Sequence, residues 1–376
     1  MVKILEQRVL YRQPRFHAAF PSILRFGDDR LLLAFRRARD GLWLIPEDRR
    51  EGLDPLARMD HIDSRSHIAL LELEPDGTPS STEPELLPMD PEAADQDPSL
   101  LLLPDGQVFL SSFSWYPLPS DAAQHLAGRR PPGDEYSGCR FLFWGSHANL
   151  RGRQPHSWVY HHGFIPPDGG YGRSISPDGS KQLIGANRGS ALWHGGEILL
   201  AVYGNTEEGA ALFASADLGR HWQLRGIIAQ DATAKLSYQE PALCRDEQGD
   251  LIAFLRTGGG GGRLASCRSS DGRHWSEPVL HQLIGHPFHP LPLADGRLLL
   301  TYGYRSQPFG IRARLLDRPS ANPDDFPEII LRADGTCPDL GYPWAVQLAD
   351  GRVLVCYYLT DSSGIRHIAG SWLELD

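Results

Sequence analysis

The amino-acid sequence predicts an all-β fold, a six-bladed β-propeller, on three observations: six repeated hairpins, two copies of a turn motif and no long helical pattern. In each hairpin a short apolar strand enters a turn rich in Gly and Asp and leaves as a second apolar strand, because such turns tolerate positive φ. Successive turns lie about 50 to 90 residues apart, which suits one four-stranded blade per hairpin. The hairpins begin at Phe20, Asp97, Gly189, Gln239, His289 and Gly341.

The turn motif, here called an Asp box, supports the same fold. The first copy spans 215–222 and reads Ser-x-Asp-x-Gly-x-x-Trp, and a shortened copy spans 269–275. In such a box the Ser and Asp side chains can tie a hairpin turn to its neighbours, while the indole packs between blades. We therefore predict a structural role for both boxes and no part in catalysis.

The domain organisation follows from length and composition. No linker-like change in composition divides the 376 residues, so we predict one domain covering residues 1–376. The segment around 117–185, rich in Gly, Pro, His and aromatic residues, is predicted as a long loop insertion that shapes a binding face. The strand near 2–10 is expected to pair with the strand near 365–372, which closes the last blade and covers a sheet edge.

Charge and motif content exclude several classes of partner. The formal net charge of −10 disfavours a nucleic-acid partner. No apolar stretch has the length of a secretory signal or a membrane span, which predicts a cytoplasmic location without membrane contact. Five scattered cysteines favour buried, reduced thiols. The histidine spacing suits no metal site, and no motif implies a cofactor. The oligomeric state stays open.

Candidate chemistry is expected at the propeller axis. The first strand of every blade lines the central channel, so polar residues at the starts of these strands converge on one depression. Asp97 is one such residue, and we expect it to bind substrate. The six strand starts are Phe20-Pro21, Asp97-Pro98, Arg188-Gly189-Ser190, Tyr238 to Pro241, His286 to His289, and Gly341-Tyr342-Pro343.

Four of these features together carry a resemblance to a known family. They are the hairpin array, the Asp boxes, Glu240-Pro241 followed 16 residues later by Arg256, and Gly341-Tyr342-Pro343 at the start of the final blade. The chain resembles the sialidase (neuraminidase) superfamily over nearly its whole length. The resemblance implies an exo-acting glycoside hydrolase that removes a terminal acidic sugar, sialic acid or a related keto-deoxy sugar.

The resemblance also implies a pair of catalytic groups. Tyr342 matches the nucleophile of sialidases, and Glu240 matches the glutamate that activates it. A neutral phenol suits this task, because the anomeric carbon of the substrate bears a carboxylate that repels an anionic nucleophile. The general acid of the family is an aspartate in the loop after the first hairpin, where Asp60 and Asp63 precede the strand 68–73. Such an acid needs a raised pKa to hold its proton near neutral pH.

Sialidases bind the substrate carboxylate through three arginines, whose planar forks form bidentate, charge-assisted hydrogen bonds. Arg256 matches one of them. Ala19 occupies the position of the first, and Arg305 and Arg312 are the candidates for the third. Arg37, at the end of the first hairpin, is a further candidate for the same cavity.

Two alternatives remain open. His286 and His289 are candidate substrate ligands that supply the missing donor, or bases in a β-elimination lyase acting on uronate-containing glycans. The other alternative is a glycan-binding propeller without turnover.

Overall fold

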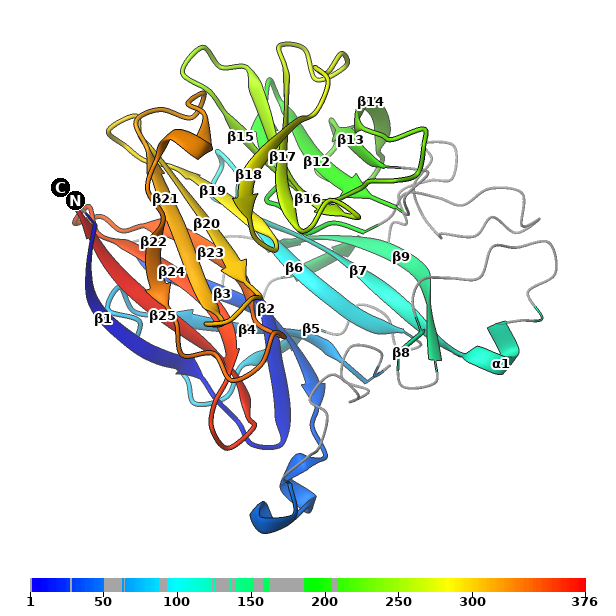
Figure 1. The fold of residues 1–376 in the computed structure, drawn as a ribbon, viewed down its shortest axis with the longest axis vertical. Coiled ribbons are helices and arrows are strands. Elements are labelled where there is room, and N and C mark those ends of the chain that lie inside the picture. Colours follow the sequence, from blue (N-terminus) through cyan, green and yellow to red (C-terminus); the bar gives the residue numbers. More distant parts are fainter. Residues whose placement is uncertain are drawn as a thin grey trace.

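The computed structural model describes residues 2–27, 29–50, 63, 65–87, 93–123, 125, 135–136, 139–151, 158–161, 186–204 and 209–376. The described strands form six antiparallel sheets that surround a common centre (Figure 1). The chain is therefore a six-bladed β-propeller, as the hairpin array predicted. Each predicted hairpin supplies the two innermost strands of one blade.

In each of the first three blades, the strands follow one another from the centre outwards. Blade one holds β2 (Phe16–Phe26), β3 (Arg30–Arg39), β4 (His67–Leu73) and β5 (Glu85–Leu87), with the short helices η1 (Leu42–Leu44) and η2 (Glu47–Arg49) after β3. Blade two holds β6 (Ala94–Leu102), β7 (Val108–Pro119), β9 (Cys139–Arg151) and β10 (Trp158–His161), with α1 (Ser120–Ala123) and with β8 (Glu135–Tyr136) paired to β9. Blade three holds β11 (Leu192–His194), β12 (Glu197–Tyr203), β13 (Ala210–Ser215) and β14 (Gln223–Ala229).

The other three blades follow the same plan. Blade four holds β15 (Ser237–Arg245), β16 (Leu251–Gly258), β17 (Arg263–Ser269) and β18 (Val279–Ile284). Blade five holds β19 (Phe288–Pro292), β20 (Leu298–Tyr304), β21 (Gly310–Leu316) and β22 (Ile329–Arg332), with the helix η5 (Pro323–Asp325) before β22. Blade six holds β23 (Gly341–Gln347), β24 (Val353–Thr360), β25 (Arg366–Leu375) and β1 (Val2–Tyr11).

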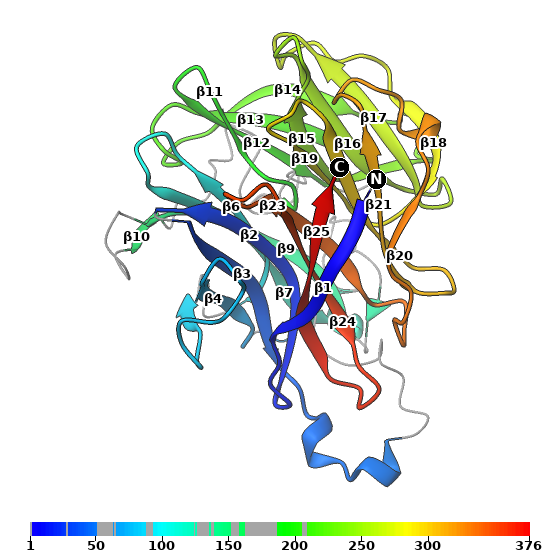
Figure 2. The same ribbon diagram turned by 90° about the vertical axis from the view of Figure 1, so that its left-hand side faces the viewer.

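The last blade is closed by the N-terminal strand, as expected from the sequence. β1 pairs antiparallel with β25, with Val2 opposite Leu375 and Val9 opposite Ala369. Figure 2 shows the two strands side by side, with both ends of the chain next to each other. Leu10 and Tyr11, at the end of β1, are buried in the core of blades one and six. The two ends of the chain thus complete one sheet.

The prediction of a loop insertion at 117–185 needs correction. β7 continues to Pro119, and the third and fourth strands of blade two, β9 and β10, lie within this segment. The apolar run Phe141-Leu142-Phe143-Trp144 is the strand signal that the Gly- and Pro-rich composition concealed. The segment therefore contributes half of a blade.

Both Asp boxes connect the third strand of a blade to the fourth. In the first box the Ser215 hydroxyl accepts a hydrogen bond from the Gly219 amide at 2.8 Å, and Asp217 accepts one from the His221 amide at 2.9 Å. The Trp222 indole donates to the Gly219 carbonyl and packs against Phe109 of blade two, with ring centroids 6.1 Å apart. The second box repeats these bonds. The expected packing of the indole between blades is confirmed for Trp222.

Among the residues that the structure describes, no helix is long and apolar enough to cross a membrane. Four of the five cysteines, Cys244, Cys267, Cys337 and Cys356, are buried free thiols.

Candidate active site

A repeated backbone feature directs four side chains to the axis. In the described chain, Phe20, Asp97, Glu240 and Tyr342 have φ values of 56°, 32°, 50° and 48°, and each precedes a proline on the innermost strand of its blade. The strand ladder skips a step at each of these positions, as in a β-bulge. Positive φ is uncommon for residues with a Cβ and concentrates at functional sites. The feature therefore marks blades one, two, four and six as the walls of a site.

The centre of the site is a hydrogen bond between Tyr342 and Glu240. The Tyr342 phenol donates a short hydrogen bond to Glu240 Oε1, although the two residues are 102 positions apart in the chain. Both side chains are buried, with 8% and 2% of their surface exposed. The Phe20 ring packs against Tyr342 with centroids 4.6 Å apart. Blades one, four and six thus meet at one cluster.

Two arginines flank this pair. Arg256 Nη1 donates to Glu240 Oε2 at 3.1 Å. Arg305, which follows β20, lies over the Tyr342 ring with its Cζ 5.5 Å from the centroid. Its Nε donates to the Leu340 carbonyl at 3.2 Å, and its Nη2 contacts the Tyr358 hydroxyl at 3.5 Å. Both guanidinium groups are therefore fixed beside the phenol and the carboxylate.

Electrostatic interactions and burial shift the pKa values of Glu240 and Tyr342 in opposite directions. Burial alone would raise the pKa of Glu240, but Arg256, the Tyr342 hydrogen bond and Arg305 together hold it below its ordinary value. Burial and the negative charge of Glu240 raise the pKa of Tyr342 well above its ordinary value. At neutral pH the pair is therefore a neutral phenol and a carboxylate, which is the state needed for proton transfer from Tyr342 to Glu240.

Two further predicted residues, Asp97 and His286, lie close to this cluster. Asp97 is buried and interacts electrostatically with Tyr342. Burial, followed by the charges of Arg256 and Arg305, lowers the pKa of His286 to about 4. His286 is therefore a neutral imidazole at physiological pH, next to two cations.

Three predicted ligands, Arg312, Arg37 and His289, contact other groups in the described structure, and their role as substrate ligands stays a prediction. Arg312 is buried within blade five, where it donates to the carbonyls of Arg332 and Pro308 and pairs with Glu328 at 3.3 Å. Arg37 lies over the Phe16 ring in blade one and donates to His67. His289 stacks on Trp344 with ring centroids 4.6 Å apart and contacts the Ala345 carbonyl. These contacts stay within or between blades.

The structure describes one of the two candidate acids, Asp63. Asp63 accepts hydrogen bonds from Arg39 Nε at 2.7 Å and from the Arg65 amide at 3.0 Å. Both of its carboxylate oxygens therefore have protein donors. Asp60 lies outside the described residues.

Several residues of the cluster were not predicted from the sequence. Arg188, before β11, donates to the Tyr342 carbonyl at 2.8 Å. Tyr203 interacts electrostatically with Glu240 and Tyr342, and Tyr358 donates to buried Asp339 at 2.6 Å. Of these residues, Arg188 was the one that its sequence position could have indicated, because it stands at the start of the inner strand of blade three.

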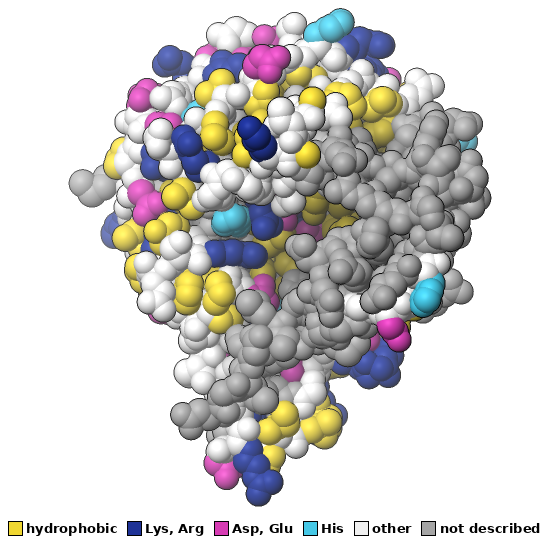
Figure 3. Space-filling view, turned by 45° about the vertical axis from the view of Figure 1, so that its right-hand side comes forward, with side chains coloured by type: hydrophobic (Ala, Val, Ile, Leu, Met, Phe, Trp, Pro, Cys, Tyr) yellow, Lys and Arg dark blue, Asp and Glu magenta, His cyan; other side chains and the backbone are white. Residues whose placement is uncertain are grey.

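A recess is visible on one face of the molecule, where basic and histidine side chains border acidic and hydrophobic ones (Figure 3). Within the described ranges, no three His, Cys, Asp or Glu side chains are grouped to hold a metal ion. The described contacts bring together a buried phenol, a carboxylate and two guanidinium groups.

Comparison with known proteins places this chain in a family. A protein of unknown function from Dyadobacter fermentans is 35% identical, with 100% of this chain and 99% of that chain covered and a TM-score of 0.84. The BNR repeat-like domain matches residues 180–355. No curated protein sequence matches.

More distant solved structures share the fold. The sialidase NanB from Streptococcus pneumoniae is 13% identical, covering 98% of this chain and 70% of that chain, with a TM-score of 0.62. An α-L-arabinanase from Penicillium chrysogenum is 12% identical, covering 98% of each chain, with a TM-score of 0.62. The chain belongs to one family with the Dyadobacter protein, and it shares the six-bladed β-propeller fold of the sialidase and the arabinanase.

Proposed function

We propose that this protein is an exo-acting glycoside hydrolase of the sialidase type that removes a terminal acidic sugar. One observation carries the proposal: the buried hydrogen bond from Tyr342 to Glu240, with Arg256 and Arg305 beside it. A phenol, a carboxylate and two guanidinium groups side by side match a substrate whose anomeric carbon carries an acid group. The fold neighbours that act on glycans support the same class.

In the proposed first step, the Tyr342 oxygen forms a bond to the anomeric carbon while Glu240 takes the phenol proton. The glycosidic bond breaks, and the leaving oxygen needs a proton from a general acid. Asp60 is the remaining candidate for that acid, because Asp63 is engaged by Arg39 and the Arg65 amide. Water then cleaves the sugar from Tyr342, which regenerates the phenol.

Arg256 and Arg305 are the proposed ligands of the substrate acid, since Arg256 pairs with Glu240 and Arg305 lies over the Tyr342 ring. His286 is proposed as a neutral hydrogen-bonding group beside them, because its lowered pKa keeps it uncharged. Ala19 and Phe20 are buried where the first arginine of sialidases is expected. Two of the described cations, Arg256 and Arg305, are therefore proposed to hold the acid group, and the sugar acid is expected to lie in a different orientation from that of sialic acid in a three-arginine site.

A second candidate function is supported by the same imidazole. A neutral His286 next to two arginines suits a base that removes the proton α to an arginine-bound carboxylate, as in uronate lyases. Such a reaction yields an unsaturated product with ultraviolet absorbance, whereas hydrolysis does not.

The test uses aryl glycosides of sialic acid and of related keto-deoxy sugars. Wild-type protein should release the aryl group, and Tyr342→Phe should lower kcat at least about 1000-fold. Tyr302→Phe is the matched control, because its phenol also donates to a carboxylate, Glu328, at 2.9 Å but lies in the contact between blades four and five. Full activity of Tyr342→Phe would refute the assigned nucleophile.

A further inference from the structure

Arg188 connects three blades at the propeller axis. It lies before β11 of blade three, and its Nη2 donates to two backbone carbonyls, Pro21 of blade one at 3.0 Å and Tyr342 of blade six at 2.8 Å. Pro21 follows Phe20, so both acceptors belong to the bulges with positive φ described above. One side-chain nitrogen therefore holds the backbone of two of these turns.

The guanidinium of Arg188 also lies between two aromatic rings. Its Cζ is 5.1 Å from the Tyr342 centroid and 5.0 Å from the Trp344 centroid. A cation over an aromatic face is attracted by the ring quadrupole, more strongly when both are desolvated. Trp344 in turn stacks on His289. The Tyr342 ring is thus supported from the protein interior.

Burying the charged side chain of Arg188 costs free energy. Only 3% of its surface is exposed, and its Nε and Nη1 find no hydrogen-bond partner among the described residues. Burial lowers its pKa, which the charges of Asp97, Tyr342 and Glu240 oppose. Since unpaired donors of a buried cation cost free energy, stability alone is a poor reason for an arginine here.

We propose that Arg188 is a positioning residue for Tyr342: it fixes the turn that directs the phenol at Glu240, and its charge favours negative charge on the phenol oxygen. The catalytic consequence rests on the proposed function. The effect on the phenol itself does not, because it follows from the contacts of Arg188 with the Tyr342 ring and carbonyl.

The experiment measures the acidity of residue 342 directly. A polyfluorinated tyrosine, whose phenol is more acidic than that of tyrosine, is incorporated at position 342 and titrated by fluorine NMR. Removing the cation with Arg188→Met should raise the midpoint by about one pH unit or more. The other groups that face this phenol stay unchanged: Glu240, Asp97, Arg256, Arg305, Tyr203 and Tyr358.

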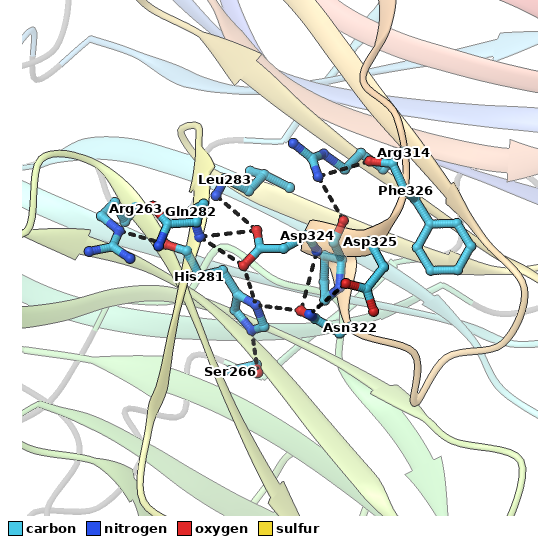
Figure 4. A network of polar contacts seen from close by, with 11 residues as sticks. Arg263, Ser266, His281, Gln282, Leu283, Arg314, Asn322, Asp324, Asp325 and Phe326 are labelled. Carbon is cyan, nitrogen blue, oxygen red and sulfur yellow. Dashed lines mark hydrogen bonds and ion pairs between the residues drawn. The ribbon is translucent and has the colours of Figure 1, made fainter.

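Arg314→Met is the matched control. One nitrogen of Arg314 also donates to two carbonyls, Pro323 at 2.7 Å and Phe326 at 2.9 Å, but in blade five (Figure 4). Its replacement should leave the midpoint of residue 342 unchanged. An unchanged midpoint in Arg188→Met, in a protein that still melts cooperatively, overturns the proposal.

Arg188→Lys keeps the test decisive if the Met variant does not fold. Lysine preserves the charge but loses the planar fork that lies between the rings and reaches both carbonyls. We expect a smaller shift of the midpoint and, on any aryl glycoside that the wild type cleaves, a kcat at least about 10-fold lower with little change in KM. Wild-type values for both quantities overturn the positioning role. Lack of turnover by the wild type refutes the proposed function instead, and leaves the titration result standing.

Discussion

His289 shows how burial sets the charge of a single residue. It lies against Trp344 and near the charge of Arg188, and burial, followed by that charge, lowers its pKa from 6.5 to about 3. Burial and the two nearby arginines act in the same direction on His286. Neither histidine therefore contributes a cation to the site at neutral pH, and the positive charge there comes from arginines.

The lowered pKa of His289 predicts a loss of stability in acid. The unfolded state binds a proton as pH falls below about 6.5, whereas the folded state does not until the pH nears the folded value. Stability is therefore full above 6.5 and falls below it. Between pH 7 and pH 4.5 the wild type should lose about 2 kcal/mol more than His289→Gln, measured by urea unfolding. Above pH 7 the two proteins should show the same pH dependence, and parallel curves below it would contradict the assignment.

Sequence reasoning found the residues of the site that stand next to proline on inner strands. Glu240 and Tyr342 stand before proline at the starts of inner strands, and the resemblance to sialidases assigned their roles. Arg37 and Arg312 lie on the second and third strands of their blades, in β3 and β21. There the side chains face neighbouring rings and carbonyls, and a short apolar pattern does not reveal which blade face a residue takes. Arg188 stands at one of the predicted strand starts, but the resemblance gave it no role.

Among the elements, β18 illustrates how an outer strand is protected. The Asp324 carboxylate of η5 accepts hydrogen bonds from the Gln282 amide at 2.9 Å and the Leu283 amide at 3.2 Å (Figure 4). His281 joins the same network through Ser266 at 2.8 Å and Asn322 at 3.2 Å. The Ser, His and Asp here have the order of a hydrolase triad, but the carboxylate is occupied by strand amides. The network therefore joins blade five to the edge of blade four.

Removing this carboxylate should loosen the edge of blade four. Asp324→Ala leaves two amides of β18 without their acceptor, and we expect a loss of about 1 to 3 kcal/mol in the free energy of unfolding. Hydrogen exchange at residues 282 and 283 should become faster. Asp325→Ala, at the next position of η5, is the control and should change neither quantity by much. Equal effects of the two substitutions would show that β18 is held by other contacts.

At the scale of the whole molecule, the ring depends on its closure. β1 is the outermost strand of blade six and also contacts blade five, where Gln7 Nε2 donates to the Leu331 carbonyl at 2.6 Å. Without β1, the backbone groups of β25 become an unpaired edge, which can pair with another chain.

A variant that lacks residues 1–11 should therefore be less stable and more prone to associate. It also loses the buried side chains of Leu10 and Tyr11. We expect its Tm to fall by about 10 °C or more and light scattering to reveal oligomers. Lys3→Ala is the control, because the exposed pair with Glu374 at 3.6 Å contributes little. A truncated protein with the wild-type Tm would show that β25 needs no partner strand.

The sequence predicted the number of blades and their closure, since both follow from local hairpins and their repetition. It did not reveal the outer strands of blade two. Their apolar residues lie in a segment dominated by turn formers, and outer strands bury less apolar surface than inner ones. Local pattern thus specifies the inner half of this propeller better than its rim.

At the interrupted ladders of Phe20, Asp97, Glu240 and Tyr342, the identity of the side chain is independent of the strand pairing that builds the blade. At each place the hydrogen-bonding partners resume beyond the proline, so the ladder continues whichever side chain occupies the preceding position. An aromatic ring, two acids and a phenol already occupy equivalent positions of one scaffold. Exchanging one of them would give the pocket a new preference among ligands while the blades keep their register.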